Sequence, residues 1–295
     1  MWFNSAQLLV ALQRQELSFM RFSATPIAVF IWSSFARGKI VLLLSAFVAA
    51  GALATAFPQT TCRDLLPDGD PANKRLAAAC QRVWELQQRL PNFLCEESVS
   101  TFKQSWLQHK ITAQVAYEDG REQYRDIEVD GKSVASMSVA PGSWSTGEFG
   151  SDLLVLFNPA GATKFVFKKL ESVESRSVYV FEFALSRQNN HSWEINVPGA
   201  AVTPGFSGRL YVDAETANVV RVEFRAVDFD GSSGLESYVK VIEYAEVKLG
   251  DGSSFLLPQK SRQEICTRQS GCFRNELKFT NFRKFAARSR VLPAY

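Results

Sequence analysis

The hydrophobic positions follow two different periods along the chain. Between Asp70 and Pro91 they recur every three or four residues, which predicts an amphipathic helix with Asp70 as its cap and Pro71 in its first turn. After Pro91 the period changes to two, and Asp-Gly pairs at 119–120 and 130–131 are typical of hairpin turns. The pattern therefore predicts one helix followed by a series of antiparallel strands.

The predicted strands form a mainly antiparallel fold of the α+β class. Residues 178–185 are largely apolar on both faces, as in a strand that is covered on both sides, whereas residues 220–226 alternate apolar with charged side chains. About ten strands joined by short turns favour a sheet that curls, because a flat sheet of that width twists into a barrel or splits. Strands that do not alternate with helices exclude a doubly wound sheet. The other predicted elements are strands at 111–118, 121–129, 132–136, 209–213, 239–249, 255–257, 259–266 and 273–282 and a short helix at 151–157.

The first 56 residues have the features of a targeting segment. A short basic region precedes the apolar stretch 40–54, and an Ala-Thr-Ala sequence at its end offers the small residues that a signal peptidase accepts. We expect cleavage near Phe57. The alternative is an uncleaved helix that anchors the protein in the inner membrane, since about 20 apolar residues can span a bilayer. A second apolar run upstream leads us to interpret residues 1–35 as a misassigned start of the chain, with a helical hairpin at the membrane over residues 23–56 as the alternative.

The rest of the chain contains no internal repeat, and no Pro/Gly-rich linker divides it. We predict a signal peptide or amino-terminal membrane segment (1–56), a linker (57–70), a single domain (71–285) and a tail (286–295). Export would place the domain in the periplasm or outside the cell.

Five cysteines are consistent with export to an oxidising compartment. Cys266 and Cys272 are close enough in sequence to form a disulfide across a hairpin or loop. Near the amino end, one pair among Cys62, Cys80 and Cys95 could bond and leave one thiol, and we take Cys80 and Cys95 as the candidates. The C-x-x-C spacing of a redox motif or a zinc site is absent.

Charge and histidine content exclude several classes of function. The chain has 33 basic and 30 acidic residues, but residues 57–295 have 29 of each, so they lack the basic surface that nucleic-acid binding requires. With only His109 and His191, a zinc enzyme built on several histidines is excluded. No glycine motif for phosphate or dinucleotide binding occurs, and the Gly-Phe-Ser-Gly-Arg sequence at 205–209 lacks the final glycine of a nucleophile elbow. The sequence predicts no cofactor, no metal and no enzymatic activity.

Two groups of carboxylates stand out on the predicted strands. They are Glu96 with Glu97, and Glu122 with Asp126 and Glu128. We interpret both groups as solvated strand faces, which need no function.

Aromatic residues make up 12% of the chain, including 23 phenylalanines. A single curved sheet with one main helix has few partners for both faces, so we expect some aromatic residues to line an apolar concavity, a common type of ligand site. An ordinary packed core is the alternative. We expect Phe181→Glu to abolish ligand retention in a folded protein. The candidate lining residues are Phe165, Phe167, Tyr179, Phe181, Phe183, Phe224, Leu277 and Phe279.

Residues 208–223, Gly-Arg-Leu-Tyr-Val-Asp-Ala-Glu-Thr-Ala-Asn-Val-Val-Arg-Val-Glu, resemble the periplasmic lipoprotein carriers of the LolA and LolB type. In that superfamily a strand of the form G-x-[LV]-[WY]-[VI]-D precedes a turn and a strand with an Arg-x-Glu-like end. Residues 240–258 resemble the next hairpin, and the whole similarity spans about 72–285. Segments 90–95 and 273–282 also resemble poorly characterised secreted proteins of soil acidobacteria.

The resemblance implies an incomplete half β-barrel with an amino-terminal helix, a short lid helix and an apolar concave face. It implies a function in shielding lipid acyl chains during transfer between membranes. The extra cysteines and larger loops depart from the dedicated carriers, and the arginine that latches their lid has no counterpart in this chain.

We therefore expect an exported, monomeric, non-enzymatic protein that holds a lipid, an acyl chain or a lipoprotein in an apolar half-barrel cavity. The alternative is an envelope structural or protein-interaction module with a filled core. In that case an envelope protein would be the partner, and function would reside in loops 137–147 and 228–237.

Overall fold

The computed structural model describes Cys62 and residues 69–137, 147–173, 175–197, 199–250 and 252–285. All of these belong to the second of two units of the chain, residues 54–295. The predicted signal segment, the predicted tail and most of the predicted linker lie outside the described residues, as does most of loop 137–147. Within the described ranges, no helix is long and apolar enough to cross a membrane.

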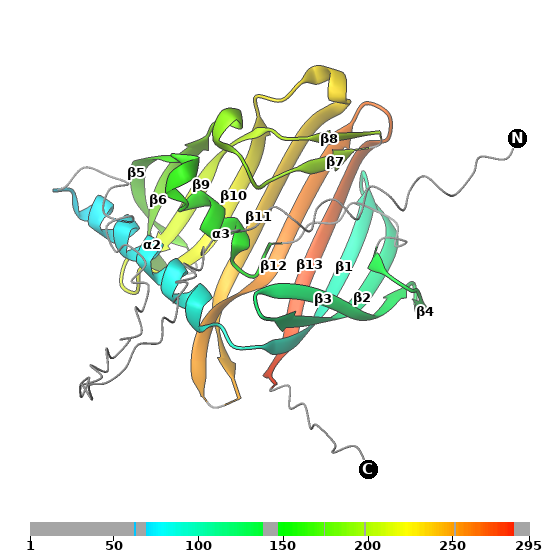
Figure 1. Ribbon diagram of the computed structural model, residues 1–295, viewed down its shortest axis with the longest axis horizontal. Coiled ribbons are helices and arrows are strands. Elements are labelled where there is room, and N and C mark those ends of the chain that lie inside the picture. Colours follow the sequence, from blue (N-terminus) through cyan, green and yellow to red (C-terminus); the bar gives the residue numbers. More distant parts are fainter. Residues whose placement is uncertain are drawn as a thin grey trace, which may run out of the picture. The chain divides into compact units, whose positions relative to one another are not determined.

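Eleven strands form one antiparallel sheet, in the order β4-β3-β2-β1-β13-β12-β11-β10-β9-β6-β5. The sheet is open, with β4 and β5 at its two edges, which confirms the predicted incomplete half-barrel (Figure 1). Its strands are β1 (Phe93–Lys103), β2 (Trp106–Glu118), β3 (Arg121–Val129), β4 (Lys132–Ser133), β5 (Lys164–Val173), β6 (Arg176–Leu185), β9 (Gly205–Asp213), β10 (Val219–Val227), β11 (Leu235–Leu249), β12 (Ser253–Thr267) and β13 (Gly271–Lys284).

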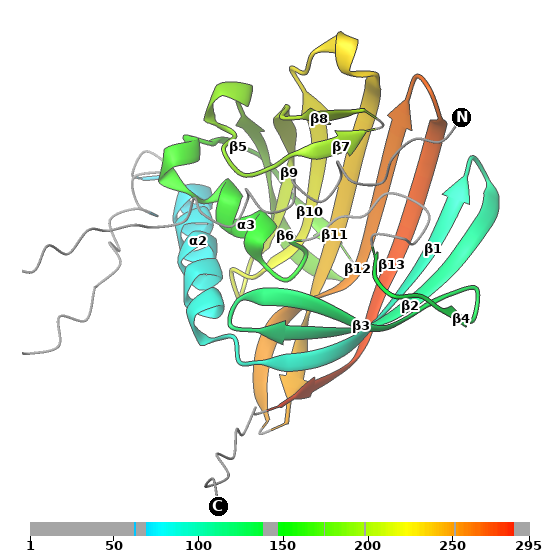
Figure 2. The same cartoon turned by 45° about the vertical axis from the view of Figure 1, so that its right-hand side comes forward.

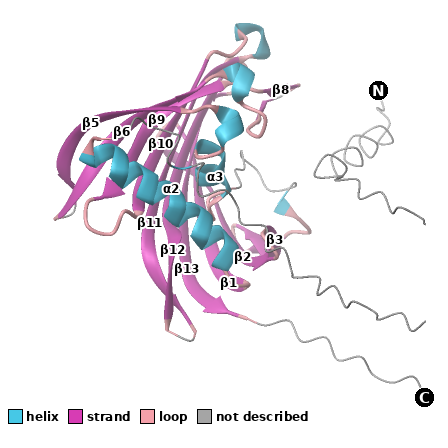
Figure 3. Cartoon of the chain, turned by 60° about the vertical axis from the view of Figure 1, so that its left-hand side comes forward, coloured by secondary structure: helices cyan, strands magenta, loops and turns pink. Residues whose placement is uncertain are grey.

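Two α-helices of the described residues lie on the same side of this sheet (Figure 3). They are α2 (Pro71–Arg89) and α3 (Ser151–Leu156). The sheet curves around that side, which we call the concave face (Figure 2). The remaining described elements are a small hairpin of β7 (Ile195–Val197) and β8 (Ala200–Val202) and three-residue 3-10 helices at Pro159–Gly161, Arg187–Asn189 and Gly231–Ser233.

The ends of α2 are those that the sequence predicts. The Asp70 side chain accepts a hydrogen bond from the Ala72 amide at 2.9 Å, and Pro71 occupies the first turn, where its missing amide hydrogen costs nothing. The helix ends two residues before Pro91. Its apolar stripe packs against the concave face and consists of the buried residues Ala72, Leu76, Ala79, Cys80 and Val83.

The concave face carries two separate hydrophobic clusters. Cluster 1 joins α2 and α3 to β5, β6, β9, β10 and β11, and cluster 2 lies mainly on β1, β2, β12 and β13. On the opposite face, Val178, Val180 and Tyr211 form a third, small cluster. Strand β6 is therefore covered on both faces, as its sequence predicts.

Several predicted strands differ at their ends, since β4 ends at Ser133 rather than at residue 136 and β9 begins at Gly205 rather than at residue 209, and one prediction differs in continuity. Residues 253–267 form the single strand β12, whereas Pro258 suggested a break between two shorter strands. Pro258 lies opposite Tyr244, where the register between β11 and β12 shifts. A residue without an amide hydrogen is tolerated at such an irregularity, so the strand continues through it.

The segment that carries the family resemblance forms β9, a turn and β10. Gly208 admits no larger side chain, because a Cβ atom there would lie 1.8 Å from the Glu223 carbonyl oxygen and 2.7 Å from the Phe183 ring. The Asp213 carboxylate accepts hydrogen bonds from the amides of Glu215 and Thr216 and closes the turn. These residues of the motif therefore shape the sheet.

Candidate ligand-binding site

The eight candidate lining residues all lie on the concave face. Phe165, Phe181, Phe183 and Phe224 belong to cluster 1, where Phe167 and Tyr179 pack against them, and Leu277 and Phe279 belong to cluster 2. Neighbouring rings are in contact: the centroids of Phe183 and Phe224 are 5.5 Å apart and those of Phe167 and Phe181 5.8 Å.

The packing of Phe181 changes what a substitution there would test. Its side chain is completely buried. A glutamate at this position would place an unpaired charge in the core, which costs several kcal/mol. The substitution Phe181→Glu would therefore report on folding rather than on ligand retention.

A row of directly paired residues crosses eight strands of the concave face, and it is aromatic in one half and polar in the other. On β5, β6, β9 and β10 the paired positions are Phe165, Phe183, Gly208 and Phe224. On β11, β12, β13 and β1 they are Lys240, Gln263, Asn275 and Thr101, all of them buried. Directly paired residues share one face of a sheet, so the aromatic residues of β5, β6 and β10 and the buried polar residues of β11, β12, β13 and β1 form one continuous row on the concave face.

The polar half of this row borders both clusters, since Lys240 lies between Tyr238 and Ile242 of cluster 1 and Thr101 follows Val99 of cluster 2, and it is not fully hydrogen-bonded. The Thr101 hydroxyl, the Gln263 side-chain oxygen and the hydroxyl of the neighbouring Ser261 have no hydrogen-bond partner among the described residues. Buried polar atoms without partners cost free energy, so this part of the concave face is not optimised for stability.

Lys240 is the centre of a buried ion cluster that joins the sheet to α3. Its Nζ lies 2.7 Å from Asp152 Oδ2 and 3.0 Å from Glu148 Oε1. The other Asp152 oxygen accepts a hydrogen bond from Trp193 Nε1 at 3.0 Å. Burial opposes the charge on Lys240, but attraction to Asp152 and Glu148 outweighs it and raises the lysine pKa well above its usual value.

Two further carboxylates face this cluster, which corrects our interpretation of them as solvated. Glu97 is buried on the concave side of β1, and Glu122 is half-buried on β3. Burial, followed by repulsion from Glu148 and then Glu122, raises the pKa of Glu97 to about 8. Burial and Glu148 also raise the pKa of Glu122 to about 7, although hydrogen bonds from the Gly147 amide and the Tyr124 hydroxyl oppose the shift.

The remaining carboxylates of those two groups, Glu96, Asp126 and Glu128, are exposed as expected. Strand alternation explains the first pair, because Glu97 points to the face opposite that of Glu96. Glu122 differs from Asp126 and Glu128 because the register between β2 and β3 shifts between these positions.

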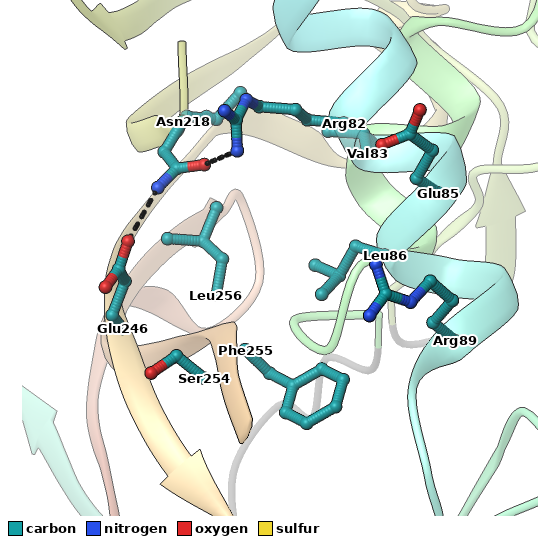
Figure 4. Close-up of a pocket in the computed structure, with 11 residues that line it drawn as sticks. Arg82, Val83, Glu85, Leu86, Arg89, Asn218, Glu246, Ser254, Phe255 and Leu256 are labelled. Atoms are coloured by element: carbon teal, nitrogen blue, oxygen red, sulfur yellow. Dashed lines mark hydrogen bonds between the residues drawn. The ribbon is translucent and has the colours of Figure 1, made fainter. Parts of the chain in front are cut away.

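A pocket of about 160 Å³ lies between α2 and the sheet (Figure 4). We call it the α2 cleft. Arg82, Glu85 and Arg89 stand at its helix side, and Asn218, Glu246 and Ser254 at its sheet side. Between them its lining is apolar and consists of Val83, Leu86, Val219, Phe255 and Leu256.

The α2 cleft touches both core clusters of the concave face. Val83 and Val219 are buried members of cluster 1, and Leu256 packs against it. Phe255 packs against cluster 2. The α2 cleft therefore exposes residues of both hydrophobic clusters to solvent. None of the eight candidate lining residues borders it.

The residues considered for catalysis lie in ordinary structural positions. Ser207 is part of strand β9, so no strand-to-helix elbow forms around it. His109 lies in β2 with its Nδ1 2.8 Å from Asp130 Oδ2, and His191 is exposed. In the described ranges, no group of three or more His, Cys, Asp or Glu residues could hold a metal ion.

The structure contains two disulfides, Cys62–Cys80 and Cys266–Cys272. The second crosses the β12–β13 hairpin. Of the two amino-terminal candidates, Cys80 bonds to Cys62, and Cys95 is a free, buried thiol. Cys80 lies on α2 in cluster 1 and Cys95 on β1 in cluster 2, so these two do not meet. Burial raises the pKa of the Cys95 thiol.

Sequence reasoning missed both the α2 cleft and the polar row. The cleft joins three segments distant in sequence, so no local pattern marks it. Lys240 did carry a signal, since it occupies an inward position between Tyr238 and Ile242 in an alternating strand. A charged residue at such a position indicates a buried ion cluster.

Comparisons with known proteins do not identify a family. No protein-family model and no curated protein matches the sequence.

Among solved structures, a DUF1329 family protein from Desulfovibrio piger is 14% identical with a TM-score of 0.38, over 75% of this chain and 96% of that one. A LolA superfamily protein from Nitrosomonas europaea is 16% identical with a TM-score of 0.33, over 73% and 94%. A domain from Vibrio parahaemolyticus assigned to outer membrane lipoprotein sorting is 12% identical with a TM-score of 0.39, over 74% and 95%. Similarity at this level names neither a family nor a function, and it lends no support to the acidobacterial resemblance of segments 90–95 and 273–282.

Proposed function

We propose that the protein is an exported, non-enzymatic carrier that binds an apolar chain on the concave side of its open sheet. The α2 cleft is the observation that carries this proposal. It is a hollow with an apolar lining, and its walls belong to both hydrophobic clusters of the concave face. A chain that enters there contacts side chains that already exclude water.

The size of the α2 cleft sets how much of a chain it accepts. Its volume of about 160 Å³ is close to that of an engineered apolar cavity of roughly 150 Å³ that binds benzene, so about six carbon atoms fit. Burial gains about 0.8 kcal/mol per CH₂, or about 5 kcal/mol for six. A longer chain requires α2 or α3 to move away from the sheet, because the aromatic residues beneath them pack against one another.

Three further observations support export and a relation to the LolA and LolB carriers. The Cys62–Cys80 and Cys266–Cys272 disulfides suit an oxidising compartment. The strand–turn–strand at 208–223 resembles the motif of those carriers. An open antiparallel sheet with helices on its concave side is the architecture that the resemblance implies.

Native mass spectrometry with organic extraction tests the carrier function. The chain is produced with its own amino-terminal segment and purified from an oxidising periplasm without detergent. We expect a co-purifying mass that extracts as lipid, or uptake of an added fatty acid or phospholipid. A ligand-free mass with no uptake would refute the proposal and favour a protein-interaction module with a filled core.

A pair of matched variants tests whether the α2 cleft is the entry site. Leu86 is half-buried on α2 and lines the cleft, so Leu86→Trp would fill it without burying a charge. Leu107→Trp makes the same change at an exposed position of β2 that does not line the cleft. We expect uptake to fall at least tenfold in Leu86→Trp and to stay unchanged in Leu107→Trp. Equal uptake by both variants would place the ligand elsewhere.

A further inference from the structure

Two arginines flank the apolar lining of the α2 cleft. Arg82 and Arg89 are seven residues apart on α2, which is two turns or about 10 Å along the helix axis, so they project from the same face. Leu86 lies between them on that face, and both guanidinium groups are exposed at the rim. The cleft thus combines an apolar lining with cations at its mouth.

Neither arginine is paired with a carboxylate within the described residues. Arg82 Nη1 donates to Asn218 Oδ1 at 3.5 Å, and Asn218 Nδ2 in turn donates to Glu246 Oε1 at 3.1 Å (Figure 4). Arg89 makes no hydrogen bond or ion pair with any described residue. Figure 4 shows its guanidinium beside Leu86. A guanidinium that lies next to apolar surface without a carboxylate partner can bind an anionic group by donating two parallel hydrogen bonds to it.

The two carboxylates of the α2 cleft do not neutralise the arginines by direct contact. Glu85 accepts a hydrogen bond from Gln81 Nε2 at 2.8 Å, and in Figure 4 its carboxylate points away from Leu256 and Phe255. Glu246 is held by Asn218 on the sheet side of the cleft. Both acids therefore accept hydrogen bonds from neutral amides and leave the arginines available.

We propose that the α2 cleft binds the anionic head of a single-chain amphiphile, with Arg89 as its main partner and Arg82 as a second cation. The inference rests on the proposed carrier function and names the class of ligand: an apolar chain that ends in a carboxylate or a phosphate. The chain lies over Leu86 and Leu256, and the volume of the cleft admits one chain and not two. A neutral or cationic head would leave the guanidinium groups unpaired.

Three amphiphiles with the same twelve-carbon chain test this inference below their micellar concentrations. They are dodecanoate, the zwitterionic dodecyldimethylamine oxide and dodecyltrimethylammonium, with affinity measured by isothermal titration calorimetry. We expect the wild-type chain to bind dodecanoate at least tenfold more tightly than the other two. The variant Arg82→Gln/Arg89→Gln should lose that preference and bind all three alike.

The control variant is Lys74→Gln/Arg75→Gln, which removes the same charge from α2 at positions outside the cleft. It should keep the wild-type preference, which separates local binding from a general effect of net charge. Unchanged dodecanoate affinity in Arg82→Gln/Arg89→Gln, or an equal loss in the control, would overturn the head-group inference alone, because chain binding would persist. Binding of none of the three amphiphiles to the wild-type chain would overturn the carrier function together with the inference.

Discussion

Glu97 gives the most decisive test of the buried charge arrangement. Its carboxyl group lies on the concave side of β1, where burial, followed by repulsion from Glu148 and Glu122, raises its pKa from 4.5 to about 8. The substitution Glu97→Gln keeps the shape of the side chain and removes its ability to ionise. It should therefore stabilise the fold at high pH and have little effect at low pH.

The direction and the size of this effect on the free energy of unfolding follow from proton linkage. The folded state holds the Glu97 proton up to a pH of about 8, whereas the unfolded chain releases it near 4.5, so stability falls as pH rises between these values and is constant above them. With about 1.4 kcal/mol per pKa unit, the loss between pH 5 and pH 9 amounts to about 4 kcal/mol. Glu97→Gln avoids this loss.

Urea unfolding at pH 5 and at pH 9 measures the effect. We expect wild type and Glu97→Gln to differ by about 1 kcal/mol or less at pH 5, and the variant to be more stable by about 4 kcal/mol at pH 9. Glu96→Gln is the control, since Glu96 is exposed on the opposite face and should change stability by less than about 0.5 kcal/mol at either pH. A difference between wild type and Glu97→Gln that does not grow with pH would refute the argument.

Three other substitutions test separate parts of the structure by urea unfolding. Replacing Cys62 and Cys80 by serine should cost about 3 kcal/mol, because the disulfide closes a loop of 18 residues, and this difference should vanish when wild type and variant are both measured in a reducing agent. Gly208→Ala should cost about 1–3 kcal/mol or more through overpacking between β9 and β10, whereas Gly231→Ala, with nothing within 4 Å of its Cβ position, should be close to neutral. Lys240→Met should cost about 3–5 kcal/mol at pH 8, because it leaves two buried carboxylates without their cation. The cost should fall as the pH is lowered, since burial raises the pKa of Asp152 and favours its neutral form; a cost that does not change with pH would contradict the ion cluster.

Much of the fold was predictable because its signals are local. The cap at Asp70 and the stop at Pro91 define α2, and the Asp-Gly turns at 119–120 and 130–131 place the first hairpins. The strand β12 was predicted as two pieces, because the tolerance of Pro258 depends on a register shift in a neighbouring strand. A local pattern carries no information about that shift.

The sequence predicted aromatic residues of the concave face, but it predicted no residue that lines the α2 cleft. The aromatic positions of β5, β6 and β10 follow from alternation alone, and all of them lie on the concave face. The polar row cannot be derived from alternation, because Thr101 and Asn275 become neighbours only when β1 pairs with β13. For Glu97 the sequence held an unused signal: alternation with Cys95 and Val99 assigns it to the buried face. Adjacent acidic residues suggested a solvated surface, and that composition-based interpretation was wrong.

The motif that resembles the carrier family therefore accounts for shape rather than for binding. Gly208 leaves room for the Phe183 ring, and Asp213 closes the turn between β9 and β10. Arg221 and Glu223 pair at 2.8 Å on the face opposite the concave side. Among the residues of that motif, only Asn218 and Val219 reach the α2 cleft.

A sheet of this form supplies a concave apolar surface whatever it binds, since folds host many functions. What distinguishes this chain is the set of residues added to that surface: two arginines at the cleft that pair with no carboxylate of the described residues, and a buried lysine among carboxylates. Specificity for a ligand is to be sought in those residues, because the motif fixes the wall of the cavity and leaves its chemistry open.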